Sequence, residues 1–184
     1  MTEVYAFLAD GLEEVECLAV ADVLIRGGVN VTLVSIGERR DVSGSHGFRI
    51  MANKKIDEVN LEEADLLFLP GGMPGTKKLG ECKVLCDGLL KANQRGKRIA
   101  AICAAPGLLG DLGILESRKA TCYPGFEDRL TGAEYTNTGV VTDQNITTAR
   151  GLGYALDLGI ELLRILKNDE TALRVKQSIQ YDQH

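Results

Sequence analysis

Short, uninterrupted apolar runs separated by helix-length segments are the feature that most constrains this chain. The runs lie at 4–9, 29–35, 66–69 and 98–102. They lack the apolar–polar alternation of a half-exposed strand, so they predict strands covered on both faces, as in a parallel sheet. Between the first two, segment 12–26 is typical of a helix closed by Gly27 and Gly28. A strand, a helix and a second strand in this order predict a right-handed crossover and a parallel strand pair.

The same alternation continues to the end of the chain. Further strands are predicted at 119–122, 140–142 and 146–149, a short helix after Asn60, and longer helices at 83–95, 154–166 and 171–179. The polar, turn-rich segment 37–51 breaks the pattern, and its short runs at 41–42 and 48–51 predict a hairpin at the sheet edge. We therefore expect one α/β domain over residues 1–184, with a doubly wound, mostly parallel sheet between helices.

Composition excludes several classes of partner. The formal net charge is −5, no run of Lys or Arg occurs, and aromatic residues make up 5% with no Trp. These values argue against nucleic-acid and anionic-membrane partners, and no apolar run approaches the ~20 residues that span a bilayer. The cysteine count is odd, at five, and no signal-like segment begins the sequence, so we expect a reducing cytoplasm. Cys82 and Cys86 have no second ligand pair nearby, so no metal site is expected.

Cys103 is the strongest candidate for a reactive residue. It ends the apolar strand 98–102 and precedes a helix that starts at Pro106, which is the arrangement of a nucleophile elbow. The small residues Ala101 and Ala105 flank it at the two positions where strand and helix must pass closely. A helix N-terminus next to the sulfur predicts a thiol pKa below the roughly 8.5 of a free cysteine. The alternative is that Cys103 is a small buried apolar residue.

Glu16 is the second candidate. On the predicted helix, Leu12, Val15, Ala19 and Val23 form an apolar stripe, with Glu16 on its flank and Glu14 pointing away. A carboxyl that leans toward the core predicts a raised pKa and a dedicated partner. The alternative is an ordinary acidic residue in the first turn of a helix.

A glycine-rich loop follows the strand at 66–69. It contains Gly71 and Gly72, whose backbone N–H groups could hold a phosphate or an oxyanion. The loop lacks the Lys and Ser/Thr of a P-loop and the spacing of a dinucleotide fingerprint, so no nucleotide cofactor is expected. A plain turn remains the alternative.

These residues are predicted to converge. Glu16, Gly71, Gly72, Cys103 and Arg150 each follow shortly after a predicted strand, and the carboxyl ends of parallel strands share one edge of the sheet. We therefore expect one crevice that contains all five. His46, at the tip of the predicted hairpin, is one of two histidines and is either a solvated loop residue or a contact of the site.

Four segments resemble the DJ-1/ThiJ/PfpI superfamily, most closely its DJ-1-like branch. They are LADGLEEVE at 8–16, LPGG at 69–72, AAICAAP at 100–106 and TARG at 148–151. The resemblance implies a flavodoxin-like homodimer without a cofactor, with Cys103 as the reactive cysteine and a protonated Glu16 beside it. It also implies that Gly72 and Ala104 supply oxyanion-binding amides.

The chain departs from the family pattern at three positions. Ala104 stands where the peptidase-like branch has a histidine, so a Cys-His protease would lack its base. Tyr123 stands where many DJ-1-like members have a histidine, and a phenol with a pKa near 10 is a poor base at neutral pH. His46 stands at the position of an arginine that reaches across the DJ-1 dimer.

Three functions follow as hypotheses. The first is a cofactor-independent glyoxalase or deglycase that acts on a small aldehyde or a glycated substrate, with Cys103 as nucleophile and Glu16 as proton shuttle. The second is an oxidative-stress sensor in which Cys103 oxidises to sulfinate, and the third is a structural or chaperone role in which Cys103 is dispensable. A thiamine-related role and a peptidase role fit the residues less well.

Overall fold

The computed structural model describes residues 2–181 and contains a seven-stranded sheet in the order β10-β11-β7-β6-β1-β2-β5. All neighbouring strands pair in parallel except β10 and β11, which are antiparallel. The strands of this sheet are β1 (Glu3–Leu8), β2 (Asn30–Ser35), β5 (Lys54–Lys55), β6 (Leu66–Leu69), β7 (Arg98–Ile102), β10 (Val140–Asp143) and β11 (Ile146–Ala149). The predicted doubly wound, mostly parallel sheet is confirmed.

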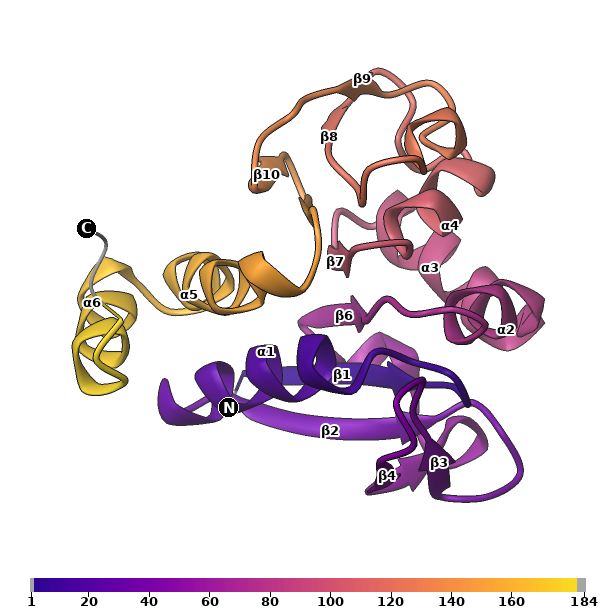
Figure 1. Cartoon of the computed structure of the whole chain (residues 1–184), viewed down its shortest axis with the longest axis horizontal. Helices are drawn as coiled ribbons and strands as arrows, with labels where there is room; N and C mark the ends of the chain where they lie inside the picture. The colour runs from indigo at the N-terminus through magenta and orange to yellow at the C-terminus, as the bar shows by residue number, and fades with distance from the viewer. Residues whose placement is uncertain (1, 182–184) are drawn as a thin grey trace.

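Helices cover both faces of the sheet (Figure 1). They are α1 (Glu14–Arg26), α2 (Gly75–Glu81), α3 (Lys83–Gln94), α4 (Pro106–Asp111), α5 (Ala155–Leu166) and α6 (Asp169–Ser178). Shorter elements are β3 (Asp41–Ser43), β4 (Arg49–Met51), β8 (Lys119–Ala120) and β9 (Glu134–Tyr135), with the 3-10 turns η1 (Ile56–Glu58), η2 (Leu61–Glu63), η3 (Glu127–Arg129) and η4 (Leu152–Tyr154).

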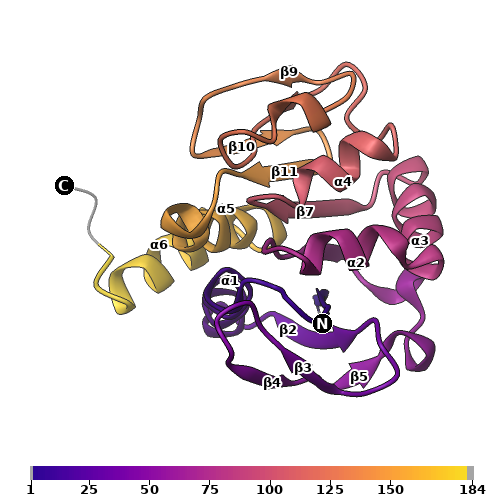
Figure 2. The same cartoon turned by 45° about the vertical axis from the view of Figure 1, so that its right-hand side comes forward.

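Alternate residues of each strand face opposite cores, because successive side chains of a strand point to opposite sides. Ala6 and Leu8 of β1 pack with α1, α5 and α6, whereas Phe7 packs with α2, α3 and α4. Figure 2 shows the two helical layers on either side of the sheet. Since both faces are covered, the strands have no polar face, which explains the continuous apolar runs in the sequence.

The strand order reverses between β1 and β6. From β1 the chain crosses to β2 on one side, and it later returns to β6 on the other. Ligands of doubly wound sheets bind where the strand order reverses in this way, outside the carboxyl ends of the strands. Glu16 follows β1 and Gly71 follows β6, so both lie beyond the two strands between which the order reverses.

The start of α1 differs from the prediction. The helix begins at Glu14, with the side chain of Glu13 as its N-cap, and not at Leu12. Val15, predicted to lie on the apolar stripe, is exposed, and Glu14, predicted to point away, is buried. The reason is that the β3–β4 hairpin folds over this end of α1 and covers Glu14.

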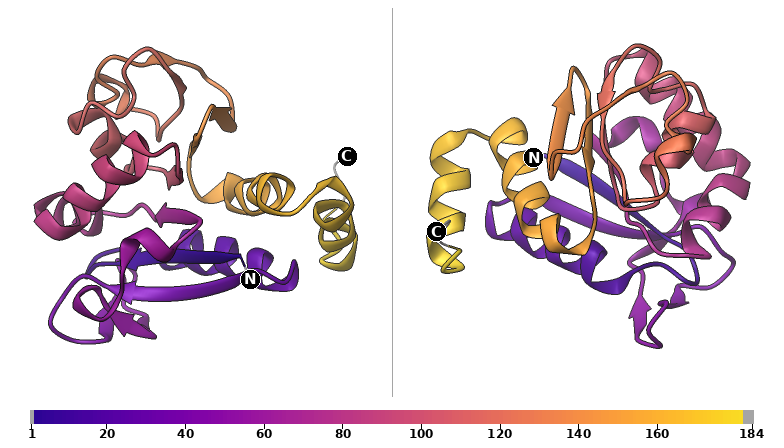
Figure 3. Two further views of the ribbon diagram at one scale, coloured as in Figure 1. Left: turned by 180° about the vertical axis from the view of Figure 1, so that it is seen from behind. Right: turned by 45° about the horizontal axis from the view of Figure 1, so that its top comes forward.

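Two other predictions needed correction. The hairpin exists, but β3 and β4 form a separate two-stranded sheet, and β5 is the edge strand next to β2. Helix α2 was not predicted, because its sequence contains two glycines and begins after two prolines. The views in Figure 3 place α6 at one end of the molecule, packed on α5. Within residues 2–181, the helices are all too short or too polar to cross a lipid bilayer.

Candidate active site

Cys103 lies in the strained turn that the sequence predicted. Its φ angle is 65°, in the left-handed region that non-glycine residues rarely adopt. Its N–H donates to the carbonyl of Ala149 on β11 (2.9 Å), and its own carbonyl accepts from the N–H of Tyr123 (2.9 Å). Ala101 and Ala105 are fully buried on either side. The turn is thus held from two neighbouring segments, and helix α4 starts three residues later.

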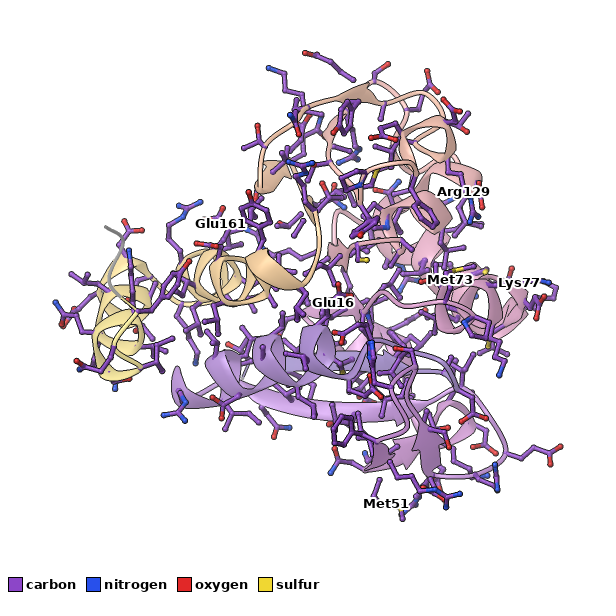
Figure 4. The ribbon with its side chains drawn as sticks, viewed as in Figure 1. Glu16, Met51, Met73, Lys77, Arg129 and Glu161 are labelled. Carbon is purple, nitrogen blue, oxygen red and sulfur yellow. The ribbon has the colours of Figure 1, made fainter. Side chains whose placement is uncertain are left out.

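Glu16 reaches the same point from α1. Its side chain is almost fully buried, at 1% exposure of the residue, and Figure 4 shows it near the centre of the molecule. The carboxyl accepts the N–H of Gly71 (3.1 Å) and of Leu152, and it is hydrogen-bonded to Cys103. The predicted buried carboxyl with a dedicated partner is therefore present, and the partner is the thiol.

Gly71 occupies the space between these two side chains. A Cβ atom at this position would lie 2.5 Å from the Cβ of Cys103 and 2.5 Å from Oε2 of Glu16. Its carbonyl also accepts the N–H of Glu13 (2.9 Å). Glycine is required here because backbone and reactive side chains approach too closely for any other residue.

Two backbone amides point at the sulfur of Cys103. They belong to Gly72 and Ala104, and both lower the pKa of the thiol by hydrogen bonding. Gly72 has a φ of +90°, and a Cβ atom there would collide with the backbone of Leu12. These are the two amides that the family resemblance implied beside Cys103.

The pKa of Glu16 agrees with the prediction from the sequence, whereas the pKa of the Cys103 thiol differs from it. Burial raises the pKa of Glu16 to about 7, as expected for a carboxyl removed from water, and the charge of Glu13 adds to the effect. Burial, followed by the charge of Glu16, also raises the pKa of Cys103 to about 12, against the opposing amides of Ala104 and Gly72. The expected low thiol pKa is therefore wrong for a cysteine that faces an ionised Glu16.

The two groups are best described as one acid–base pair. Near pH 8 they hold one proton between them, because the first proton leaves at a pKa of about 7 and the second at about 12. When that proton lies on Glu16, its negative charge is absent and the carboxyl donates to the thiolate. The helix contributes less than the sequence suggested, since α4 spans only six residues.

Arg150 and Tyr123 lie at the rim. The backbone N–H of Arg150 donates to Gly139 (3.0 Å), while its Nε atom is buried without a hydrogen-bond partner. The ring of Tyr123 stands edge-on to Phe126 at 6.4 Å and close to Gly151. Within residues 2–181, no hydrogen bond joins either side chain to Cys103 or Glu16, so neither is placed as a proton donor to the pair.

His46 is held away from the thiol. Its Nδ1 atom lies 3.1 Å from the carboxyl of Glu14 and 3.7 Å from that of Glu13. Ligand atoms of these three residues lie within 4.8 Å of one another, but Glu14 already accepts the N–H groups of His46 and Phe48. The cluster therefore fixes the hairpin tip to α1 by hydrogen bonds.

Two contributors were missed from the sequence. The amide of Leu152 donates to Glu16, and the charge of Glu13 raises the pKa of Glu16. Leu152 comes directly after the segment 148–151, so its position just beyond a predicted strand is the one feature of the sequence that could have indicated a role at the site. Glu13 carried no separate signal, because a helix N-cap explains it equally well.

A pocket of about 350 Å³ lies beside the pair. Two of its lining residues, Gly151 and Leu152, lie against the carboxyl of Glu16. A third, Tyr123, donates its N–H to the carbonyl of Cys103. Its lining consists of Tyr123, Pro124, Arg150, Gly151, Leu152, Gly153 and Tyr154. The pocket is therefore lined by residues whose backbone groups contact Cys103 and Glu16.

Comparisons with known proteins agree with this geometry. The model of the DJ-1/PfpI family matches residues 2–165. Protein DJ-1 homolog B of Arabidopsis thaliana is 37% identical over 170 residues, which is 91% of this chain, but this chain spans only 39% of that relative's own length. The glutathione-independent glyoxalase DJR-1.2 of Caenorhabditis elegans is 33% identical over 160 residues, covering 86% of this chain and 84% of the relative.

Two further relatives extend the comparison. The deglycase PH1704 of Pyrococcus horikoshii is 36% identical over 145 residues, covering 77% of this chain and 86% of the relative. The solved structure of oxidised Toxoplasma gondii DJ-1 superposes with a TM-score of 0.96 at 31% identity and covers both chains completely. The family model, the relatives and the shared flavodoxin-like fold establish that this chain belongs to the DJ-1/PfpI family, in its DJ-1-like branch.

Proposed function

We propose that this protein is a cofactor-independent enzyme that converts reactive 2-oxoaldehydes, or their adducts, into 2-hydroxy acids. The observation that carries the proposal is the hydrogen-bonded pair of Glu16 and Cys103, with the amides of Gly72 and Ala104 directed at the sulfur. A nucleophile, a proton carrier and oxyanion donors are then within reach of one carbon atom. Relatives named as a glyoxalase and a deglycase support the same chemistry.

The reaction follows from the positions of these groups. The thiolate of Cys103 adds to the aldehyde carbon, and the carbonyl π electrons move to oxygen, where Glu16 delivers its proton. The product is a hemithioacetal whose oxygen lies near the amides of Gly72 and Ala104.

The second half of the reaction is an isomerisation followed by hydrolysis. Glu16, now ionised, takes the proton from C1 and returns it to C2, while the proton of the C1 hydroxyl moves to the C2 oxygen. The hemithioacetal thus becomes the thioester of a 2-hydroxy acid. Water then cleaves the carbon–sulfur bond, so the net change is addition of one water to the 2-oxoaldehyde. A carboxyl with a pKa of about 7 can both give and take a proton near neutral pH.

A product assay tests the proposal. Purified wild type should form lactate from methylglyoxal, and Cys103→Ser should reduce kcat by about a hundredfold or more, because a serine hydroxyl stays protonated. Cys82→Ser is the matched control, since Cys82 is the other partly exposed cysteine in residues 2–181, and it should retain wild-type turnover. A folded Cys103→Ser protein with unchanged turnover would contradict the mechanism.

The sensor hypothesis makes a different prediction. In this hypothesis the wild type forms no lactate, and limiting peroxide adds two oxygen atoms to Cys103 before any other cysteine. That combined result would show that Cys103 senses oxidation and does not catalyse turnover. Access favours Cys103 and Cys82, because Cys17, Cys86 and Cys122 are buried. Peptide mass mapping after peroxide treatment distinguishes the two sites.

We also propose that the protein forms a homodimer through one face of α1 and the neighbouring hairpin. Val15, Leu18 and Ile25 are exposed on α1, at spacings that place them on one side of the helix, and Phe48 and Met51 are exposed on the hairpin. Figure 4 shows Met51 at the outer edge of the molecule. An apolar surface of this kind is typical of an interface.

A further inference from the structure

The pocket beside Cys103 is apolar on the sides that a bound substrate would meet. Tyr123 and Leu152 are each 49% exposed, and Tyr154 and Pro124 complete the wall. Arg150 is the only charged residue of the lining, and its Nε atom is buried. Exposed aliphatic and aromatic carbon next to a reactive site gains free energy when an apolar group covers it.

The walls of this pocket are positioned by the reactive site itself. Tyr123 donates its N–H to the carbonyl of Cys103 (2.9 Å), and Leu152 donates its N–H to Glu16. The ring of Tyr123 is also held by Phe126, at an interplanar angle of 79°. Two residues of the apolar lining are thus held by Cys103 and Glu16 themselves, so the pocket adjoins the site where a substrate would react.

The size of the pocket selects among carbonyl compounds. Its volume of about 350 Å³ falls in the range of small-molecule sites, whereas the methyl group of methylglyoxal is comparable to a single water molecule of roughly 30 Å³. A phenyl or branched alkyl group would contact Tyr123, Leu152 and Tyr154 together. A methyl group would leave most of that apolar surface in water.

We infer that the pocket formed by Tyr123, Pro124, Leu152 and Tyr154 binds an apolar substituent, aromatic or branched alkyl, on the ketone carbon of the substrate. The enzyme then prefers larger 2-oxoaldehydes over methylglyoxal. This inference rests on the proposed function for the reaction, but the pocket can be tested separately from turnover.

The test compares two alkylating agents that differ only in this substituent. Phenacyl bromide and bromoacetone both react with a thiolate by forming a sulfur–carbon bond and releasing bromide. The rate at Cys103 is followed by peptide mass and divided by the rate with N-acetylcysteine, which removes the intrinsic difference in reactivity. In the wild type we expect this normalised rate to be about tenfold higher for phenacyl bromide, the effect of a few methylene-sized contacts.

Substitutions in the pocket should remove this preference. Leu152→Ala shortens one wall and should bring the two normalised rates close together, and Leu152→Trp should reach the same result by filling the pocket. Leu173→Ala on α6 is the matched control, because Leu173 is similarly exposed, at 56%, and lies far from the pocket lining. It should keep the wild-type ratio. Equal normalised rates in the wild type, or an unchanged ratio in both Leu152 variants, would overturn the inference.

Turnover provides the second measurement. The wild type should convert phenylglyoxal to mandelate with a kcat/KM about tenfold above that for lactate formation from methylglyoxal. A preference for phenacyl bromide without turnover of either aldehyde would contradict the proposed function and leave the pocket supported. Turnover of both aldehydes with no preference would contradict the pocket and leave the proposed function supported.

Discussion

At the scale of single residues, Cys103 and Glu16 act as one titrating unit. Burial raises the pKa of both groups, and the charge of Glu16 raises the pKa of Cys103 further, whereas the hydrogen bond with Cys103 lowers the pKa of Glu16. The reactive form has the proton on Glu16 and the charge on sulfur. Between the two pKa values most molecules hold a single proton on the pair, and the fraction of these that carry it on Glu16 does not change with pH.

This coupling predicts the pH dependence of Cys103 alkylation. With iodoacetamide, the wild-type rate should rise through pH about 7, where the pair loses its first proton, and then level off. In Glu16→Gln the negative charge that raises the pKa of the Cys103 thiol is gone, so above pH 7 the rate should exceed that of the wild type and continue to rise at alkaline pH instead of levelling off. Glu38→Gln, at an exposed loop position, should keep the wild-type profile. Identical profiles for wild type and Glu16→Gln would show that the two groups are not coupled.

Glu16 also makes the stability of the protein depend on pH. Its pKa is near 4.5 in the unfolded chain and about 7 in the folded protein, so the folded state binds more protons between these values. Stability from this group is complete below pH 4.5 and is lost as the pH rises through 7. Over this window the wild type should lose up to about 3 kcal/mol relative to Glu16→Leu.

Urea unfolding at pH 4.5 and pH 8 measures the difference. Glu16→Leu keeps a similar volume and carries no buried charge, so its free energy of unfolding should fall less than that of the wild type between the two pH values. A parallel pH dependence for both proteins would mean that Glu16 titrates normally in the folded state.

At the scale of elements, Glu14 joins the β3–β4 hairpin to α1. Its carboxyl accepts the N–H of His46 (2.9 Å) and of Phe48 (3.3 Å), and Nδ1 of His46 lies 3.1 Å away. These hydrogen bonds lower the pKa of Glu14 although burial opposes them. The same end of α1 carries Glu16, so the hairpin also stabilises the turn of helix that presents the carboxyl of Glu16.

Removing this carboxyl should loosen the hairpin. Glu14→Ala leaves two backbone amides without an acceptor, and we expect a loss of about 2 kcal/mol in the free energy of unfolding. Hydrogen exchange at His46 and Phe48 should accelerate, while Glu38→Ala should have no effect on either measurement. Unchanged exchange at both amides would show that the hairpin is held by other contacts.

At the scale of the whole molecule, the proposed dimer places the reactive site near an interface. The exposed face of α1 begins one residue before Glu16, and the hairpin that Glu14 holds contributes Phe48. Association through this face would cover apolar side chains that are otherwise in water. It would also restrain the hairpin and the first turn of α1 together.

Light scattering at micromolar concentration tests the dimer. The wild type should have twice the mass of one chain, and Leu18→Arg should yield the monomer, because a charge at a 43% exposed apolar position would be buried without a partner. Leu173→Arg, on α6, should leave the dimer intact. A monomeric wild type would contradict the proposed dimer. A dimeric Leu18→Arg protein would show that the interface lies on another face of the molecule.

The site could be located from the sequence to a large extent. Cys103, Glu16, Gly71 and Gly72 each follow a strand whose apolar run is evident, and the geometry of parallel sheets brings such positions to one edge. Arg150 follows the same rule, but its guanidinium is not joined to the pair. Position after a strand predicts where the backbone lies and leaves the direction of a long side chain undetermined.

The sequence by itself determined the order of strands and helices, the elbow at Cys103 and the burial of Glu16, because each follows from local periodicity and residue size. Only the tertiary structure decided the burial of Glu14, the pKa of the thiol and the pocket at Tyr123 and Leu152. These properties depend on contacts between segments 30 to 90 residues apart, such as the hairpin on α1 and the loop after β6 on Glu16. Periodicity identifies the face of an element that is buried, whereas the atoms that cover it set its electrostatics.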